Sequence, residues 1–187
     1  TRHRKAYHIL SRLDDAGGEL NAYTTKEETC VYASFLKRDY ERTLELLNDI
    51  VFHSVFPEKE MEREREVIID EILSYQDNPA ELIFDDFEEL VFGNRPIGRN
   101  ILGTPDTLRA FRREDIGRFI GNNYFTDEMV LASVGNIPFG RLVRIFERYF
   151  SEVPARQRQR PRKTPGEYRP ATTIQQKNTY QAHCIIG

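Results

Sequence analysis

The chain of 187 residues contains no tryptophan and only two cysteines, Cys30 and Cys184. Cysteines this far apart form neither a disulfide framework nor a C-x-x-C site. No apolar run approaches the roughly 18 residues that a membrane span needs. The 27 lysine and arginine residues nearly balance 30 aspartate and glutamate residues, so overall charge favours neither nucleic acid nor an acidic membrane surface. These absences exclude several classes of protein and identify none.

The first residues, Thr-Arg-His-Arg-Lys, are charged, and no apolar segment follows them, so the sequence shows no signal peptide. Because a removed leader would leave the same sequence, the cytoplasm and the periplasm both remain possible compartments. The length suits one domain of ordinary size, or one domain with a linker.

Hydrophobic periodicity predicts an α+β fold with a mostly antiparallel sheet packed with several long helices. Helices are expected over 6–13, 40–51, 57–75, 78–90 and 142–149, with further helical patterns near 104 and 116–120. Residues 20–25 and 29–36 are expected to form a hairpin, and the apolar run 129–134 is expected to form a strand buried on both faces.

The composition changes over residues 154–170, which hold four prolines and a basic cluster, Arg156, Arg158, Arg160, Arg162 and Lys163. A patch that binds nucleic acid is one interpretation of this segment. Frequent prolines and the absence of periodicity favour a solvated linker instead. We therefore expect one folded domain over 1–153, a linker over 154–170, and the first strand of a second, truncated domain over 171–187.

Two carboxylates on the helix expected over 57–75 do not fit a simple structural role. At about 100° per residue, Glu71 lies within about 20° of Glu64 on a helical wheel, with Val67 and Ile68 on either side. The residues four positions away offer no cation; they are Glu60, Val67, Ile68 and Tyr75. On a buried face, such a pair needs a metal or a distant arginine. The alternative is that both glutamates reach water.

The histidines do not complete a metal site by local spacing. His3, His8, His53 and His183 form no i, i+4 pair with one another, and neither H-E-x-x-H nor H-x-x-E-H occurs. His8 and His53 are expected to be surface residues or to have their hydrogen bonds satisfied.

Four stretches in one order resemble the M16 zinc metallopeptidases, which include the processing peptidases, pitrilysin and the insulin-degrading enzymes. Residues 17–25, Gly-Gly-Glu-Leu-Asn-Ala-Tyr-Thr-Thr, are similar to the family's G-G-x-x-N-A-x-T segment. The other three stretches are 56–71, 96–104 and 130–136. The resemblance covers about residues 4–187 and implies one half of the family's LuxS/MPP-like architecture.

This resemblance also implies roles for particular residues. The family binds one catalytic zinc through the two histidines of an H-x-x-E-H helix and a glutamate on a later helix, and Glu71 matches that glutamate. Glu64 matches a second glutamate that supports the site. Asn21 and Ala22 match the edge strand on which the substrate backbone lies.

The sequence departs from the family pattern because it contains no H-x-x-E-H. We expect that motif upstream of residue 1, so that the parent protein is a zinc endopeptidase and this chain alone is inactive. The expected partners are a peptide substrate and a second M16-like half, fused or separate, in a possible homodimer or heterodimer. Nucleic acid and a membrane span are not expected. The alternative is a non-catalytic M16-like subunit that binds peptides or supports an active partner.

Overall fold

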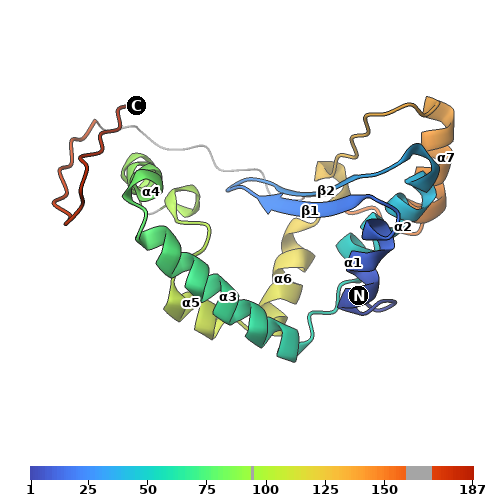
Figure 1. The fold of residues 1–187 in the computed structure, drawn as a ribbon, viewed down its shortest axis with the longest axis horizontal. Helices are drawn as coiled ribbons and strands as arrows, with labels where there is room; N and C mark the ends of the chain where they lie inside the picture. Colours follow the sequence, from blue (N-terminus) through green and yellow to red (C-terminus); the bar gives the residue numbers. More distant parts are fainter. Residues whose placement is uncertain (94, 159–169) are drawn as a thin grey trace. The chain divides into compact units, whose positions relative to one another are not determined.

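The computed structural model describes residues 1–93, 95–158 and 170–187. Contacts within the chain define two compact units. Unit 1 comprises Thr1–Pro57 and Glu114–Arg160, and unit 2 comprises Glu58–Arg113 and Pro161–Gly187. Both units are predominantly helical, and a small antiparallel sheet lies in unit 1 (Figure 1). The predicted combination of several helices with an antiparallel sheet is therefore confirmed.

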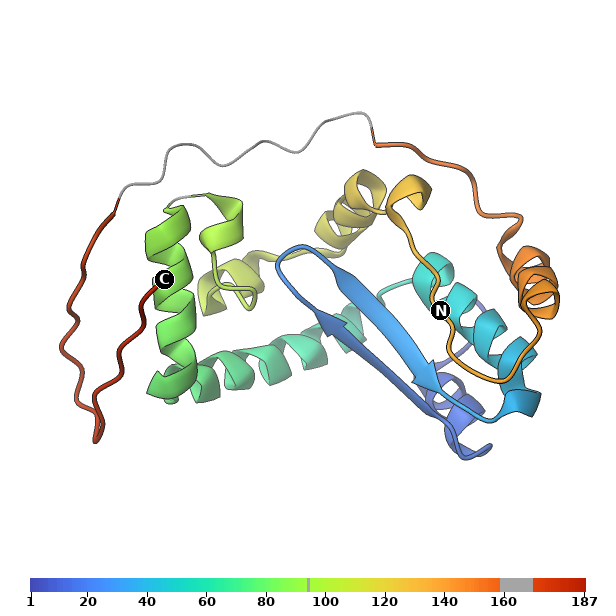
Figure 2. The same cartoon turned by 90° about the horizontal axis from the view of Figure 1, so that it is seen from above.

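Unit 1 begins with a helix and a hairpin, as predicted. The helix α1 (Ala6–Asp14) ends before Gly17, whose positive φ of 74° suits a residue without a side chain. Strands β1 (Glu19–Thr24) and β2 (Thr29–Ser34) then form an antiparallel hairpin (Figure 2). In its register, Asn21 lies opposite Tyr32. The remaining elements are η1 (Lys37–Asp39), α2 (Tyr40–His53), α6 (Arg113–Asn123), η3 (Thr126–Glu128) and α7 (Phe139–Phe150).

The core of unit 1 lies mainly between α2 and α7. Tyr40 and Leu44 of α2 and Ile145 of α7 are each at most 5% exposed and form one apolar cluster. Leu13 of α1 and Leu46 of α2 are fully buried. Full burial of a side chain of this size stabilises the fold by about 1.5–3 kcal/mol. This packing holds α2 in place, and the polar side chains of Glu45 and Asp49 lie on its other face.

Unit 2 consists of α3 (Glu58–Gln76), α4 (Pro79–Phe92), η2 (Pro96–Gly98) and α5 (Pro105–Ala110). Both α4 and α5 pack against α3, where Ile69 and Ile72 are buried. Thr104 caps α5 through a reciprocal pair of hydrogen bonds with Thr107. No helix in the described part of the chain combines the length and apolar character that crossing a membrane requires.

Two strand predictions are wrong for the described residues. The segment Met129–Val134 is irregular, and Val130 and Val134 are 91% and 101% exposed. The described segment 170–187 contains no strand either, and Tyr180 in it is fully exposed. A strand needs a hydrogen-bonded neighbour, and β1 and β2 are the only paired strands in the described ranges. Apolar composition and period-two spacing therefore indicate an extended chain, but they do not identify a neighbouring strand with which it could pair.

The predicted linker lies largely outside the described residues, because 159–169 are not described. The described residues next to it make specific contacts: the Arg156 amide donates to Thr126 Oγ1 at 2.7 Å, and Arg158 pairs with Glu128 at 2.8 Å. The domain boundary near residue 153 remains a prediction.

Candidate metal and substrate site

The candidate metal-ligating glutamates lie on α3. Pro57 precedes this helix, and Glu58 and Glu60 occupy its first turn, where negative charge complements the unpaired backbone N–H groups. Glu64 and Glu71 lie seven residues apart in the same uninterrupted helix. They therefore share one face, with about 10 Å of rise between them.

Of the two interpretations left open by the sequence, the structure agrees with the one in which both glutamates reach water. Glu64 and Glu71 are both exposed, and Val67 between them is 59% exposed. The buried residues Ile69 and Ile72 lie about 80–140° around the helix from Glu64. The contacts with α4 and α5 thus cover a different side of α3, and wheel position alone did not identify which apolar side is covered.

Neither candidate carboxylate has a hydrogen-bond or ion-pair partner among the described residues. By contrast, Glu60 on the same helix lies 3.4 Å from the guanidinium of Arg63. A free, solvated carboxylate remains available as a ligand for a divalent cation.

The residues around Glu71 do not complete a zinc site by themselves. Catalytic zinc generally uses three protein ligands and leaves one position for water. In residues 1–93, 95–158 and 170–187, only one group brings three metal-ligating side chains together, and it contains neither Glu64 nor Glu71. Glu71 is therefore compatible with zinc as a single ligand, and the described residues provide no further ligand beside it.

The candidate substrate residues Asn21 and Ala22 lie on β1 and are exposed. The N–H of Ala22 donates to Oδ1 of Asn21 at 2.8 Å. Because successive N–H groups of a strand point to opposite edges, this bond indicates that the Ala22 N–H lies on the edge away from β2. No other described strand pairs with that edge, so an extended peptide could take over this donor.

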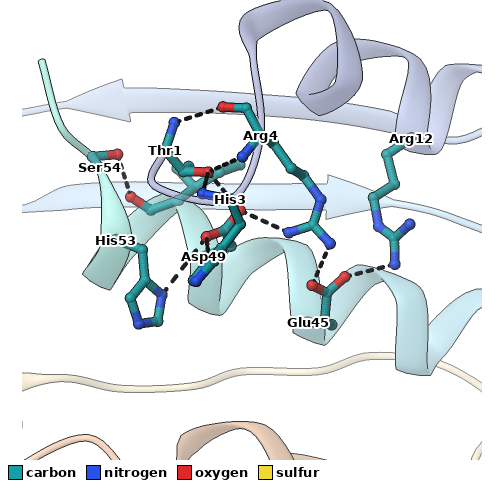
Figure 3. A network of polar contacts seen from close by, with 9 residues as sticks. Thr1, His3, Arg4, Arg12, Glu45, Asp49, His53 and Ser54 are labelled. Atoms are coloured by element: carbon teal, nitrogen blue, oxygen red, sulfur yellow. Dashed lines mark hydrogen bonds and ion pairs between the residues drawn. The ribbon is translucent and has the colours of Figure 1, made fainter. Parts of the chain in front are cut away.

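A second polar cluster joins the N-terminal segment to α2 (Figure 3). Asp49 is 2% exposed, and its Oδ2 accepts hydrogen bonds from Thr1 Oγ1 at 2.8 Å and Arg4 at 2.7 Å. Its Oδ1 lies 2.7 Å from Nδ1 of His3. Burial would raise the pKa of Asp49, but the hydrogen bonds from these three partners outweigh it and the pKa is lowered. Asp49 is therefore a buried carboxylate held in its charged form.

Glu45 extends this cluster by one helical turn. It accepts from Arg4 at 2.5 Å and from Arg12 at 2.6 Å. Burial would lower the pKa of Arg4, but its hydrogen bonds to Asp49 and Glu45 outweigh that cost and raise it. Two guanidinium groups and two carboxylates thus balance one another between the N-terminal segment, α1 and α2.

His53 lies beside Asp49, and its side chain is 34% exposed. Its Nδ1 is shielded from solvent and has no hydrogen-bond partner in the described structure, while Asp49 Oδ1 lies 3.7 Å away. The ring of His3 approaches edge-on, with 5.0 Å between ring centroids. Sequence spacing missed this group because His3 is far from Asp49 in the chain, although Asp49 and His53 form an i, i+4 pair on α2.

The comparisons with known proteins identify the class to which this fold and these residues belong. Residues 1–105 match the family model described as insulinase, peptidase family M16, and residues 110–187 match the M16 inactive domain. The chain belongs to the M16 family of peptidases, and the resemblance noted from its motifs is confirmed.

Its relatives include named zinc proteases. It is 34% identical to an uncharacterized zinc protease of Mycobacterium leprae, over 98% of this chain and 42% of that protein. It is 36% identical to the beta subunit of the mitochondrial-processing peptidase of Saccharomyces cerevisiae, over 82% of this chain and 33% of that subunit. The crystal structure of pitrilysin superposes with a TM-score of 0.75 at 20% identity, over 86% of this chain and 18% of pitrilysin. The chain thus spans less than half the length of these relatives.

Proposed function

We propose that this chain is part of a zinc-dependent endopeptidase that hydrolyses peptides or small unfolded proteins. Membership of the M16 family and the zinc proteases among its relatives support this class of reaction. The observation that carries the proposal is the pair Glu64 and Glu71, which share one exposed face of α3 without a partner among the described residues.

In this proposal Glu71 contributes one zinc ligand and Glu64 helps to position the ligand set. The two carboxylates are too far apart along the helix for one ion to bind both directly, so their roles differ. A bound zinc ion in such a site supplies Lewis acidity and an activated water. The two histidine ligands and the general base belong to residues outside this sequence, and the chain alone is inactive.

The substrate binds, in this proposal, as an additional strand along β1. The exposed Ala22 N–H would donate to a carbonyl of the peptide, since it has no partner on β2. A second M16-like half, fused or separate, would supply further substrate contacts.

Peptide hydrolysis by the full-length parent protein tests the proposed reaction. We expect Glu71→Gln and Glu64→Gln each to lower kcat/KM strongly. Glu66→Gln is the matched control, because Glu66 is exposed on the same helix at about 200° from Glu64. Peptide binding without hydrolysis by the unmodified parent would contradict the proposal and favour a non-catalytic M16-like subunit.

The strand-addition step has its own test. Ala22→Pro removes only the outward N–H, so KM for peptides is expected to rise while the β1–β2 pairing persists. Asn21→Pro is the contrasting variant, because it removes an N–H that points toward β2 and should disrupt the hairpin. An unchanged KM for Ala22→Pro would contradict binding along this edge.

A further inference from the structure

We propose that His3, Asp49 and His53 form a second metal site, which binds a divalent transition metal such as zinc and fastens the N-terminal segment to α2. One ligand atom from each residue lies within 4.8 Å of the others. The proposal concerns residues distinct from Glu64 and Glu71 and does not rest on the proposed peptidase activity.

The donor set suits zinc. It offers two imidazole nitrogens and one carboxylate oxygen, which zinc binds at about 2.0–2.2 Å. Two such donors on a tetrahedral ion lie about 3.3 Å apart. Nδ1 of His53 lies 3.7 Å from Asp49 Oδ1, close to that spacing, and Nδ1 of His3 at 2.7 Å would move outward by about 0.6 Å. The His3 side chain is 59% exposed, so this movement meets little resistance.

The two oxygens of Asp49 are divided between different tasks (Figure 3). Oδ2 accepts from Thr1 and Arg4, whereas Oδ1 faces both imidazole rings. Hydrogen bonds to the outer oxygen of a ligating carboxylate fix its orientation and are a common feature of metal sites. Glu45 meanwhile compensates the charge of Arg4, which binds the other oxygen of Asp49.

His53 provides the independent sign that a ligand belongs here. Its Nδ1 is shielded from solvent and lacks a hydrogen-bond partner among the described residues. Leaving such a nitrogen unpaired costs about 1–3 kcal/mol, and a metal bond would satisfy it. Because the His3 side chain is exposed, water could reach the bound ion as a fourth ligand.

Zinc titration of the untagged 187-residue chain tests this inference, with bound metal measured after dialysis and Co²⁺ absorption reporting the coordination geometry. We expect one Zn²⁺ per chain. Loss of an outer-shell partner typically costs about 10–100-fold in metal affinity, so His53→Ala and His3→Ala, which remove direct ligands, should each cost at least about 100-fold. His3→Ala guards against misfolding, because it alters only an exposed side chain.

Two control variants separate this site from the proposed peptidase site. His183→Gln removes an exposed histidine outside the cluster, and Glu71→Gln removes the proposed catalytic ligand. Both should bind Zn²⁺ as the unmodified chain does. The inference is overturned if the unmodified chain binds no Zn²⁺, if both His3→Ala and His53→Ala retain it, or if Glu71→Gln loses it.

Discussion

Replacing Asp49 by asparagine should destabilise unit 1 more than any comparable change of a surface acid. The carboxylate is 2% exposed and takes part in hydrogen bonds with Thr1, His3 and Arg4. Hydrogen bonds to a charged group contribute about 1.5–3 kcal/mol each, and breaking a buried ion pair by removing one partner costs about 3–5 kcal/mol. Asparagine keeps one acceptor oxygen, and Arg4 keeps Glu45. We therefore expect a loss of about 2–4 kcal/mol in the free energy of unfolding.

Urea unfolding followed by far-UV circular dichroism measures this loss, and Asp39→Asn is the matched control. Asp39 is also buried, at 8% exposed, but its cations lie farther away, with Arg38 at 3.5 Å and Arg42 at 3.9 Å. We expect its substitution to cost less than about 1 kcal/mol. Equal losses for the two variants would refute the reasoning, because they would show that burial rather than the partners of Asp49 determines the effect.

The pH dependence of the same transition provides a second criterion. The pKa of Asp49 is lowered from its ordinary value of 3.8, so its charged form stabilises the folded state above that pH. This stabilisation is lost as the pH falls below 3.8 toward the lowered pKa. The unmodified chain should therefore lose more stability than Asp49→Asn over that window. Parallel curves would contradict the direction of the shift.

Three further predictions concern the core, a helix cap and activity. Leu46→Ala, at a fully buried position, should lower the free energy of unfolding in urea by about 2–5 kcal/mol. Val67→Ala, at a side chain 59% exposed, should lower it by less than about 1 kcal/mol, and similar losses for the two variants would contradict the observed burial. Thr104→Ala should lower stability by about 1 kcal/mol through loss of the cap on α5, and Thr104→Ser should restore it. The 187-residue chain alone should hydrolyse no peptide substrate in an assay that measures release of a fluorescent group. Hydrolysis by this chain that Glu71→Gln abolishes would contradict the proposal that the other zinc ligands lie outside this sequence.

Helices and the hairpin could be predicted because their signals are local. The period of Tyr40, Leu44 and Leu47 and the sequence Asn78-Pro79 were enough to locate α2 and the start of α4. Asparagine is a preferred residue at the start of a helix because its side chain can accept a hydrogen bond from the first N–H groups, but Asn78 makes no such bond to α4. The sequence thus indicates the residue at which a helix begins more reliably than it indicates the hydrogen-bond partners of the first N–H groups.

Burial and long-range contacts could not be read from local patterns. The run Met129–Val134 has the composition of a buried strand, but the described chain offers it no neighbouring strand. On α3, both the side with Ile72 and the side with Val67 are apolar, and only packing of the other helices distinguishes them. The cluster around Asp49 joins residues about 50 positions apart, and only the Asp49 and His53 pair carried a local signal.

Zinc content per chain in the full-length parent protein tests the proposed function most directly. Glu71→Gln should lower the zinc content by one ion per chain and abolish activity, because it deletes a direct ligand of the catalytic zinc, whereas an ion at His3, Asp49 and His53 should remain bound. Glu64→Gln should retain more zinc but lower kcat, since loss of an outer-shell partner typically costs about 10–100-fold in affinity or activity. Glu66→Gln, on the opposite face of α3, should leave both quantities unchanged. Full zinc occupancy and turnover in Glu71→Gln would contradict the proposal. If Glu64→Gln instead lost zinc and Glu71→Gln retained it, the roles of the two glutamates would be reversed.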